Sequence, residues 1–127
     1  MSRPRVLVVE DERVISFLFT RTLEAAGFAV TASADGLEAL EIGLEEDFDL
    51  VLLDQRLPGL LGLEVLQRWK AAGRRFPVIM VSGMNGEDDV TSALEVGAVD
   101  YISKPFTMQE VTDRVKVRLG VTTTAGR

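Results

Sequence analysis

Residues 50–59 have the sequence Leu-Val-Leu-Leu-Asp-Gln-Arg-Leu-Pro-Gly, in which an apolar run ends in a carboxylate and a turn. A short apolar run bounded in this way predicts a buried β-strand. In an open parallel sheet, ligands bind beyond the carboxyl ends of the strands. We therefore expect Asp54 to lie at the mouth of a crevice, with the rest of the chain arranged around it.

Similar strand-like runs occur at residues 5–9, 28–32, 77–81 and 99–103. Segments with apolar residues three or four apart separate them and predict helices, the last at residues 108–119. Strands rich in Val, Leu and Ile that alternate with helices predict a parallel sheet with helices on both faces. We expect residues 28–32 to form an edge strand, Pro77 to begin the fourth strand, and Asp35 or Ser33 to cap the second helix. The helical spacing rests on apolar positions that include Val14, Ile15, Leu18, Phe19 and Leu23 in the first helix, Leu37, Leu40 and Leu44 in the second, and Leu63, Val65, Leu66 and Trp69 in the third.

Length and composition narrow the class of protein. The 127 residues suffice for one domain, expected over residues 1–120, with a flexible tail at residues 121–127. The apolar runs are far shorter than a bilayer span, which predicts a soluble protein that has no membrane partner. The absence of cysteine fits the cytoplasm, and the absence of histidine excludes a phosphohistidine donor role. A net charge of −6 argues against direct binding of nucleic acid.

Polar residues follow four of the predicted strands: Glu10 and Asp11 the first, Asp54 the third, Ser82 the fourth and Lys104 the fifth. Three carboxylates in one crevice repel each other unless a cation joins them. Without Cys or His, their oxygen atoms favour Mg²⁺ or a similar hard ion. A hydroxyl and an ammonium beside such a cluster suit a phosphoryl group, which one of the carboxylates can accept as a nucleophile. Each feature alone has an ordinary explanation as a helix cap or a turn residue, but their conjunction at successive strand ends favours a shared functional site.

These residues resemble the receiver domain of two-component response regulators from about residue 5 to residue 119. The resemblance implies a flavodoxin-like doubly wound (βα)5 fold, with a five-stranded parallel sheet in the order 2-1-3-4-5 and helices on both faces. It rests on Val8-Val9-Glu10-Asp11-Glu12, Leu53-Asp54 with Leu57-Pro58-Gly59 and Gly62, Val81-Ser82-Gly83, Gly97-Ala98-Val99-Asp100-Tyr101, and Lys104-Pro105-Phe106.

The resemblance also implies a role for each acidic residue. Asp54 would be the phosphoacceptor, phosphorylated by a histidine kinase or a histidine phosphotransfer protein. Asp11 and Asp54 would bind Mg²⁺ directly, together with the backbone carbonyl of Arg56. Glu10, which stands where the family often has Asp, would act through water. Arg56 itself would pair with Glu10, contact the phosphoryl group or face solvent.

The remaining implied roles concern the phosphoryl group and its readout. Ser82 and Lys104 would each bind a phosphoryl oxygen, and Lys104-Pro105 would be a cis peptide. Tyr101 would act with Ser82 as the switch, turning inward when Ser82 moves toward the phosphoryl group. Arg56 and Met84 hold positions that influence how water reaches the phosphorylated residue.

A receiver domain would signal to a downstream output domain or protein, rather than act as an ordinary enzyme, although it would assist its own phosphorylation and dephosphorylation. Its readout surface would be the fourth helix, fifth strand and fifth helix, including Val90 and Met108, and the same face is a candidate homodimer interface. Two alternatives stay open. One is an interaction module that works without phosphorylation, and the other is a small α/β enzyme or cofactor binder, such as an aspartyl phosphatase or a flavin protein.

Overall fold

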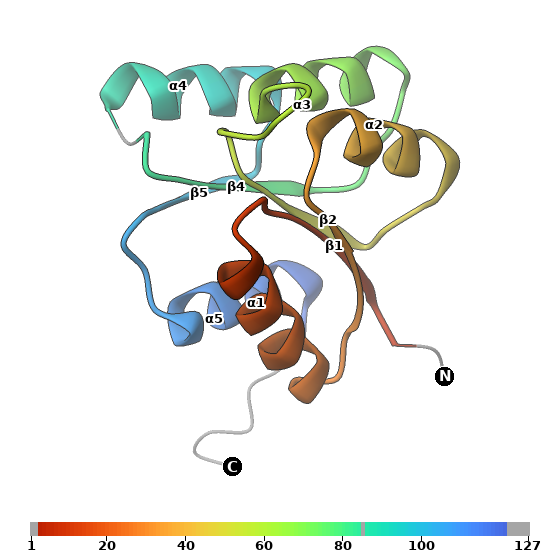
Figure 1. Ribbon diagram of the computed structural model, residues 1–127, viewed down its shortest axis with the longest axis vertical. Helices are drawn as coiled ribbons and strands as arrows, with labels where there is room; N and C mark the ends of the chain where they lie inside the picture. Colours follow the sequence, from red (N-terminus) through yellow and green to blue (C-terminus); the bar gives the residue numbers. More distant parts are fainter. Residues whose placement is uncertain (1–2, 85, 122–127) are drawn as a thin grey trace.

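The computed structural model describes residues 3–84 and 86–121, in which strands and helices alternate (Figure 1). The strands are β1 (Arg5–Val9), β2 (Ala29–Ser33), β3 (Leu50–Leu53), β4 (Val78–Ser82) and β5 (Asp100–Ser103). The helices are α1 (Arg13–Ala25), α2 (Gly36–Glu45), α3 (Gly62–Ala71), α4 (Glu87–Val96) and α5 (Met108–Leu119). No helix in this part of the chain has the length and apolar character needed to cross a membrane. Of the predicted tail, Val121 packs beside α5, and residues 122–127 lie outside the described residues.

The strands form one parallel sheet in the order β2-β1-β3-β4-β5, which confirms the predicted topology and the edge position of β2. All residues of β3 and β4 are buried, as expected for strands covered on both faces. Pro77 lies just outside β4 rather than at its first position. It has no N–H to donate to the sheet, but its carbonyl accepts the N–H of Val51 at 2.9 Å.

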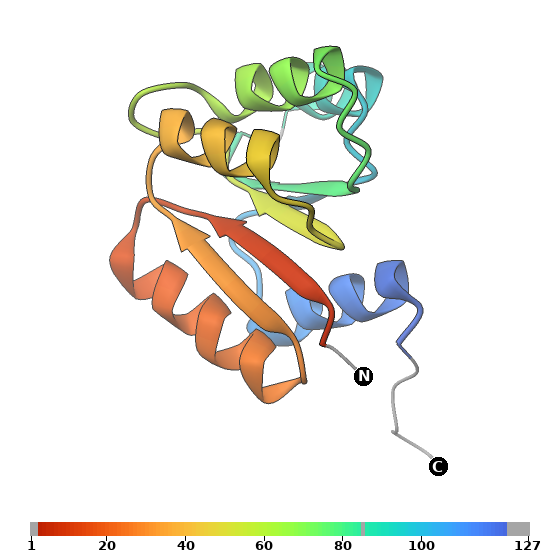
Figure 2. The same ribbon diagram turned by 90° about the vertical axis from the view of Figure 1, so that its right-hand side faces the viewer.

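Two hydrophobic cores lie on opposite faces of the sheet. Helices α1 and α5 cover one face, and α2, α3 and α4 cover the other (Figures 1 and 2). Successive side chains of a strand point to opposite faces, so Val6 and Val8 belong to the α1–α5 core, whereas Leu7 and Val9 belong to the other. Trp69 is buried in that second core, and its indole N–H donates to the carbonyl of Leu40 at 3.1 Å.

Helix α2 shows where helical spacing fails to predict burial. Leu37 and Leu44 help to define its spacing, yet they are 50% and 43% exposed. Of the three leucines that define the spacing, Leu40 is buried, and the rest of the buried face consists of the small residues Gly36, Ala39 and Gly43. A Cβ atom at Gly43 would lie 2.4 Å from the Trp69 indole nitrogen, so only glycine lets the two helices approach this closely. Val14 of α1 is likewise exposed.

The register of the strands positions the predicted site. Val9 pairs with Leu53, so Glu10 and Asp54 follow at neighbouring strand ends, and the Asp54 N–H donates to the Val9 carbonyl at 3.1 Å. Ser82 pairs with Ser103, so Lys104 comes next, and its N–H donates to the Ser82 carbonyl at 2.9 Å. The polar residues at the carboxyl ends of β1, β3, β4 and β5 therefore lie together at one end of the sheet.

Candidate functional site

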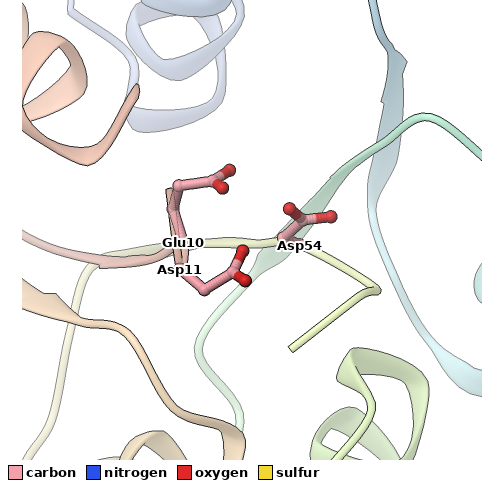
Figure 3. A group of neighbouring side chains, drawn as sticks. All are labelled: Glu10, Asp11 and Asp54. Carbon is pink, nitrogen blue, oxygen red and sulfur yellow. The ribbon is translucent and has the colours of Figure 1, made fainter. Parts of the chain in front are cut away.

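Three carboxylates meet where β1 and β3 end. Glu10 and Asp11 follow β1, Asp54 follows β3, and one oxygen atom from each lies within 4.8 Å of the others (Figure 3). Glu10 and Asp54 are buried, whereas Asp11 is exposed. In Figure 3 the carboxyl groups of Glu10 and Asp11 extend toward Asp54. An oxygen-only donor set at this spacing fits a hard divalent cation such as Mg²⁺.

The pKa of Glu10 reflects the unfavourable burial of its carboxyl group close to the carboxylate of Asp54. Burial and the nearby charge of Asp54 raise its pKa to about 7, although the hydrogen bond from the Glu12 N–H and the positive charge of Lys104 act in the opposite direction. In the metal-free protein, Glu10 therefore holds a proton well above the pH at which an ordinary glutamic acid loses it.

Lys104 supplies the positive charge on the other side of Asp54. Its Nζ atom lies 3.0 Å from Asp54 Oδ2, 3.5 Å from Glu10 Oε1 and 4.0 Å from Glu12 Oε1. Burial alone lowers the pKa of Lys104, but the hydrogen bond to Asp54 and the surrounding carboxylates raise it above its ordinary value. Lys104 thus stays protonated beside Asp54. The peptide bond between Lys104 and Pro105 is cis.

A chain of contacts connects Ser82 to Tyr101. The Ser82 hydroxyl is fully buried and accepts the backbone N–H of Met84 at 3.1 Å. The hydroxyl of Tyr101 donates to the carbonyl of the same residue, Met84. The half-buried Tyr101 ring lines a small cavity between β4, α3 and α4. A displacement of Ser82 and the segment after it would therefore alter the contact that holds Tyr101.

The predicted site residues differ in how closely the structure brings them together. Glu10, Asp54 and Lys104 make direct contacts, Asp11 completes the acidic group, and Ser82 ends the strand between those that carry Asp54 and Lys104. The Arg56 side chain is exposed, and within residues 3–84 and 86–121 it forms no ion pair with Glu10 or with another carboxylate.

Gln55 is a site residue that the sequence reasoning missed. Its N–H donates to Asp54 Oδ1 at 2.7 Å, and its side-chain oxygen accepts the N–H of Leu63 in the first turn of α3 at 2.7 Å. The sequence carries one signal for the second contact: Leu61, just before α3, is a poor helix cap, so the first turn needs an acceptor from elsewhere.

The family model for the response regulator receiver domain matches residues 6–116. The chain belongs to this family. Among its curated relatives, the alkaline phosphatase synthesis transcriptional regulatory protein PhoP of Bacillus subtilis is 41% identical over 115 residues, which are 91% of this chain and 48% of that protein. The receiver domain thus spans about half the length of this relative. The sporulation initiation phosphotransferase F of the same species is 34% identical over 116 residues and is covered over 94% of its length.

Solved receiver domains have the same architecture. The receiver domain of the Francisella response regulator 1452 superposes with a TM-score of 0.89 at 29% identity, covering 95% of this chain and 100% of that one. The receiver domain of a sensor histidine kinase from Pseudomonas aeruginosa PAO1 gives a TM-score of 0.84 at 30% identity, covering 94% of this chain and 99% of that one. That structure has a magnesium ion coordinated in its active-site cleft.

Proposed function

We propose that this receiver domain accepts a phosphoryl group on Asp54 from the phosphohistidine of a histidine kinase or a histidine phosphotransfer protein. The observation that carries the proposal is the environment of the Asp54 carboxylate. Lys104 holds one of its oxygen atoms at 3.0 Å, the Gln55 N–H holds the other at 2.7 Å, and Glu10 and Asp11 lie beside it. A nucleophilic carboxylate is thereby oriented next to the groups that neutralise a phosphoryl group.

In the proposed reaction, an Asp54 oxygen attacks the phosphorus atom, the bond from phosphorus to the donor nitrogen breaks, and the leaving imidazole takes up a proton. Asp11, Asp54 and the backbone carbonyl of Arg56 would hold Mg²⁺ directly, and Glu10 would hold it through water. When bound, Mg²⁺ supplies positive charge to the phosphoryl oxygens. The acidic group fits this ion, and the Pseudomonas receiver domain binds magnesium in its cleft.

The domain assists its own phosphorylation and dephosphorylation instead of turning over a separate substrate. Lys104 pairs with one phosphoryl oxygen, and the Ser82 hydroxyl donates to another while it continues to accept the Met84 N–H. Arg56 and Met84 flank the path by which water reaches the phosphoryl group. The family is a signalling family, and the name of the phosphotransferase relative supports a role in phosphoryl transfer.

Phosphorylation would be read on the face formed by α4, β5 and α5. Recruitment of Ser82 to the phosphoryl group pulls on Met84, whose carbonyl holds the Tyr101 hydroxyl. This biases Tyr101 and α4 toward one of two arrangements, with Val90 and Met108 on the responding face. The same face carries the exposed side chains Leu94 and Val117, which suit a phosphorylation-dependent homodimer. Sedimentation velocity with and without beryllofluoride tests that dimer, and an unchanged monomer would contradict it.

We infer two kinds of protein partner, one that donates the phosphoryl group and one that responds to phosphorylation. On the donor side, exposed Val14 and Phe17 of α1 line a hollow next to Asp11, where a phosphohistidine protein can dock. On the output side, we infer a downstream domain or protein, because the PhoP relative is about twice as long as the matched region. The net charge of −6 favours contact with protein over direct contact with nucleic acid. We propose that the protein meets both partners in the cytoplasm.

Intact-protein mass spectrometry after incubation with Mg²⁺ and acetyl phosphate tests the proposed function. The parent should gain one phosphoryl group, which Asp54→Asn lacks and EDTA abolishes. Incubation with a phosphorylated histidine phosphotransfer protein provides a second donor. If neither donor yields an adduct while both phosphorylate a known receiver in parallel, the proposal is wrong and an interaction module that works without phosphorylation replaces it.

A further inference from the structure

The first turn of α3 has no cap from its own N-terminal residue. The N-cap position is held by Leu61, whose half-exposed apolar side chain makes no hydrogen bond to the turn. The first N–H groups of a helix have no partner inside the helix and need an acceptor from outside it. Gln55 supplies one, because its Oε1 atom accepts the Leu63 N–H at 2.7 Å. The cap of α3 therefore comes from the residue that immediately follows the phosphoacceptor.

The backbone ties the same two segments together. The Gly62 N–H donates to the Gln55 carbonyl at 2.9 Å. Gly62 approaches so closely that a Cβ atom there would lie 2.1 Å from the carbonyl oxygen of Asp54. The start of α3 thus packs directly against the backbone of residues 54 and 55. The carbonyl and the side chain of Gln55 accept hydrogen bonds from two successive N–H groups of this helix, those of Gly62 and Leu63.

The opposite side of Gln55 faces the reacting group. Its N–H donates to Asp54 Oδ1, and Lys104 donates to Asp54 Oδ2. The orientation of the Asp54 carboxylate depends on where the N–H of residue 55 points. That N–H belongs to the peptide unit between residues 54 and 55, whose Asp54 carbonyl packs against Gly62, and the two contacts of Gln55 with α3 hold the Cα end of the same unit. Arg56, whose carbonyl is the proposed metal ligand, is the next residue along the same segment.

We propose that Gln55 is a positioning residue, whose side-chain amide anchors residues 54–56 to α3 and so fixes the Asp54 carboxylate and the Arg56 carbonyl for Mg²⁺. The inference rests on the proposed function. Gln55 does not contact the phosphoryl group with its side chain. It acts as hydrogen-bonded supporting groups act around a metal site, by restricting the directions of the ligands themselves.

Four variants separate this role from simple helix capping. Gln55→Met keeps the length of the side chain but removes the acceptor. Gln55→Glu keeps an acceptor oxygen for Leu63. Leu61→Ser supplies a local cap, alone and combined with Gln55→Met. The measurements are Mg²⁺ affinity by calorimetry, hydrogen exchange of the Leu63 amide in EDTA, thermal unfolding, and the rate of phosphorylation by acetyl phosphate at saturating Mg²⁺.

We expect Gln55→Met to bind Mg²⁺ about tenfold more weakly, to expose the Leu63 amide to exchange and to lower the phosphorylation rate. Gln55→Glu should keep the Leu63 amide protected. In the double variant, the introduced serine hydroxyl should restore amide protection and thermal stability but not Mg²⁺ affinity, because it has no connection to residue 55. Leu61→Ser alone should leave Mg²⁺ affinity unchanged.

Two results would overturn the role of Gln55: parent-like Mg²⁺ affinity in Gln55→Met, or full recovery of that affinity in the double variant, which would make Gln55 a helix cap only. Failure of the proposed function is distinguishable, because then the parent itself would bind no Mg²⁺ or take up no phosphoryl group.

Discussion

At the scale of single residues, Glu10 shows how strongly the site favours a cation. Its carboxyl group is almost fully buried between Asp54 and Lys104, and its pKa of about 7 reflects burial first and the neighbouring negative charge second. Among residues 3–84 and 86–121, the Lys104 ammonium is the one cation that pairs with Glu10, Asp54 and the more exposed Glu12. Adding a divalent cation would correct this imbalance, so protonation of Glu10 and metal binding should compete.

This competition predicts a pH dependence of stability in metal-free protein. The folded state binds the Glu10 proton more tightly than the unfolded state, whose pKa is near the ordinary value of 4.5. The contribution of Glu10 to the free energy of unfolding is therefore greatest at low pH and falls as the pH rises from about 4.5 to about 7. Glu10→Gln cannot ionise at this position. Between about pH 4.5 and about pH 7, its free energy of unfolding should therefore rise relative to that of the parent by on the order of 1–3 kcal/mol.

Urea unfolding of parent and Glu10→Gln in EDTA, at about pH 5 and about pH 8, measures the effect. Saturating Mg²⁺ should reduce the pH dependence of the parent, because the ion binds the ionised carboxylate. A difference between the two proteins that is the same at both pH values would contradict the raised pKa.

Lys104 gives a second prediction at this scale. Lys104→Met removes the charge next to Asp54 while keeping much of the side-chain volume. It should lower the rate of phosphorylation by acetyl phosphate by about 10²-fold, because the phosphoryl oxygens lose a charged donor. Mg²⁺ affinity should not fall, since the removed group is a cation. Stopped-flow phosphorylation and calorimetry provide the two values, and a parent-like rate would contradict the role of Lys104.

The sequence predicted these residues because each directly follows a strand, and parallel strands end at the same edge of the sheet. The sequence could not predict Gln55 in the same way. Its contact with Leu63 depends on the path of residues 57–61, which turn back toward the start of α3. That path is set by tertiary packing rather than by local residue type.

At the scale of elements, the start of α2 holds the loop that follows Asp54. Asp35 caps α2 by accepting the N–H groups of Leu37 and Glu38 at 2.7 and 3.0 Å, as predicted for one of the two candidate caps. The Gly36 N–H donates to the Pro58 carbonyl at 2.9 Å. A Cβ atom at Gly36 would lie 2.0 Å from the Leu60 carbonyl oxygen. The loop between β3 and α3 is thus packed against backbone, with no room for a side chain.

Gly36→Ala should therefore be costly although alanine favours helices. We expect it to lower the free energy of unfolding by about 1–3 kcal/mol, because the loop must move away from α2. Gly83→Ala is the control, since a Cβ atom there has no neighbour within 4 Å. Urea unfolding of both variants tests the contact, and equal stability of the two would show that the loop yields without cost.

The elements themselves were predictable where burial is uniform. Strand β3 and residues 78–81 of β4 are apolar because helices cover both faces of the sheet, so these runs stand out in the sequence. The buried face of α2 was not predictable from large apolar residues, because Gly43 and Ala39 rather than Leu37 and Leu44 lie at the helix contact. Close approach between helices selects small residues, which carry no hydrophobic signal of their own.

At the scale of the whole molecule, a short series of contacts connects the proposed phosphorylation site with the proposed response surface of α4, β5 and α5. Asp54 follows the carboxyl end of the central strand β3, Ser82 ends the neighbouring strand β4, and Met84 connects Ser82 to Tyr101 on β5. Met84 forms both hydrogen bonds of this connection, one to the Ser82 hydroxyl and one from the Tyr101 hydroxyl. A movement of Ser82 would therefore shift the group that holds Tyr101.

Tyr101→Phe tests this connection, because it removes the hydroxyl that binds Met84 and keeps the ring. Phosphorylation of Asp54 should continue at a parent-like rate. Beryllofluoride with Mg²⁺ should alter hydrogen exchange in α4 and β5 of the parent, and much less in Tyr101→Phe. Exchange mass spectrometry of both proteins provides the comparison. An equal response in the variant would mean that the signal reaches α4 without the tyrosine hydroxyl.

Locating the phosphoryl group on the chain shows directly whether Asp54 is the phosphoacceptor. Treating phosphorylated protein with borohydride reduces an aspartyl phosphate to homoserine, which tandem mass spectrometry assigns to one position. We expect homoserine at residue 54, only after incubation with both Mg²⁺ and a phosphoryl donor. Modification at Asp11, at Glu10 or at a residue outside the acidic group, with residue 54 recovered as unmodified aspartate, would contradict it.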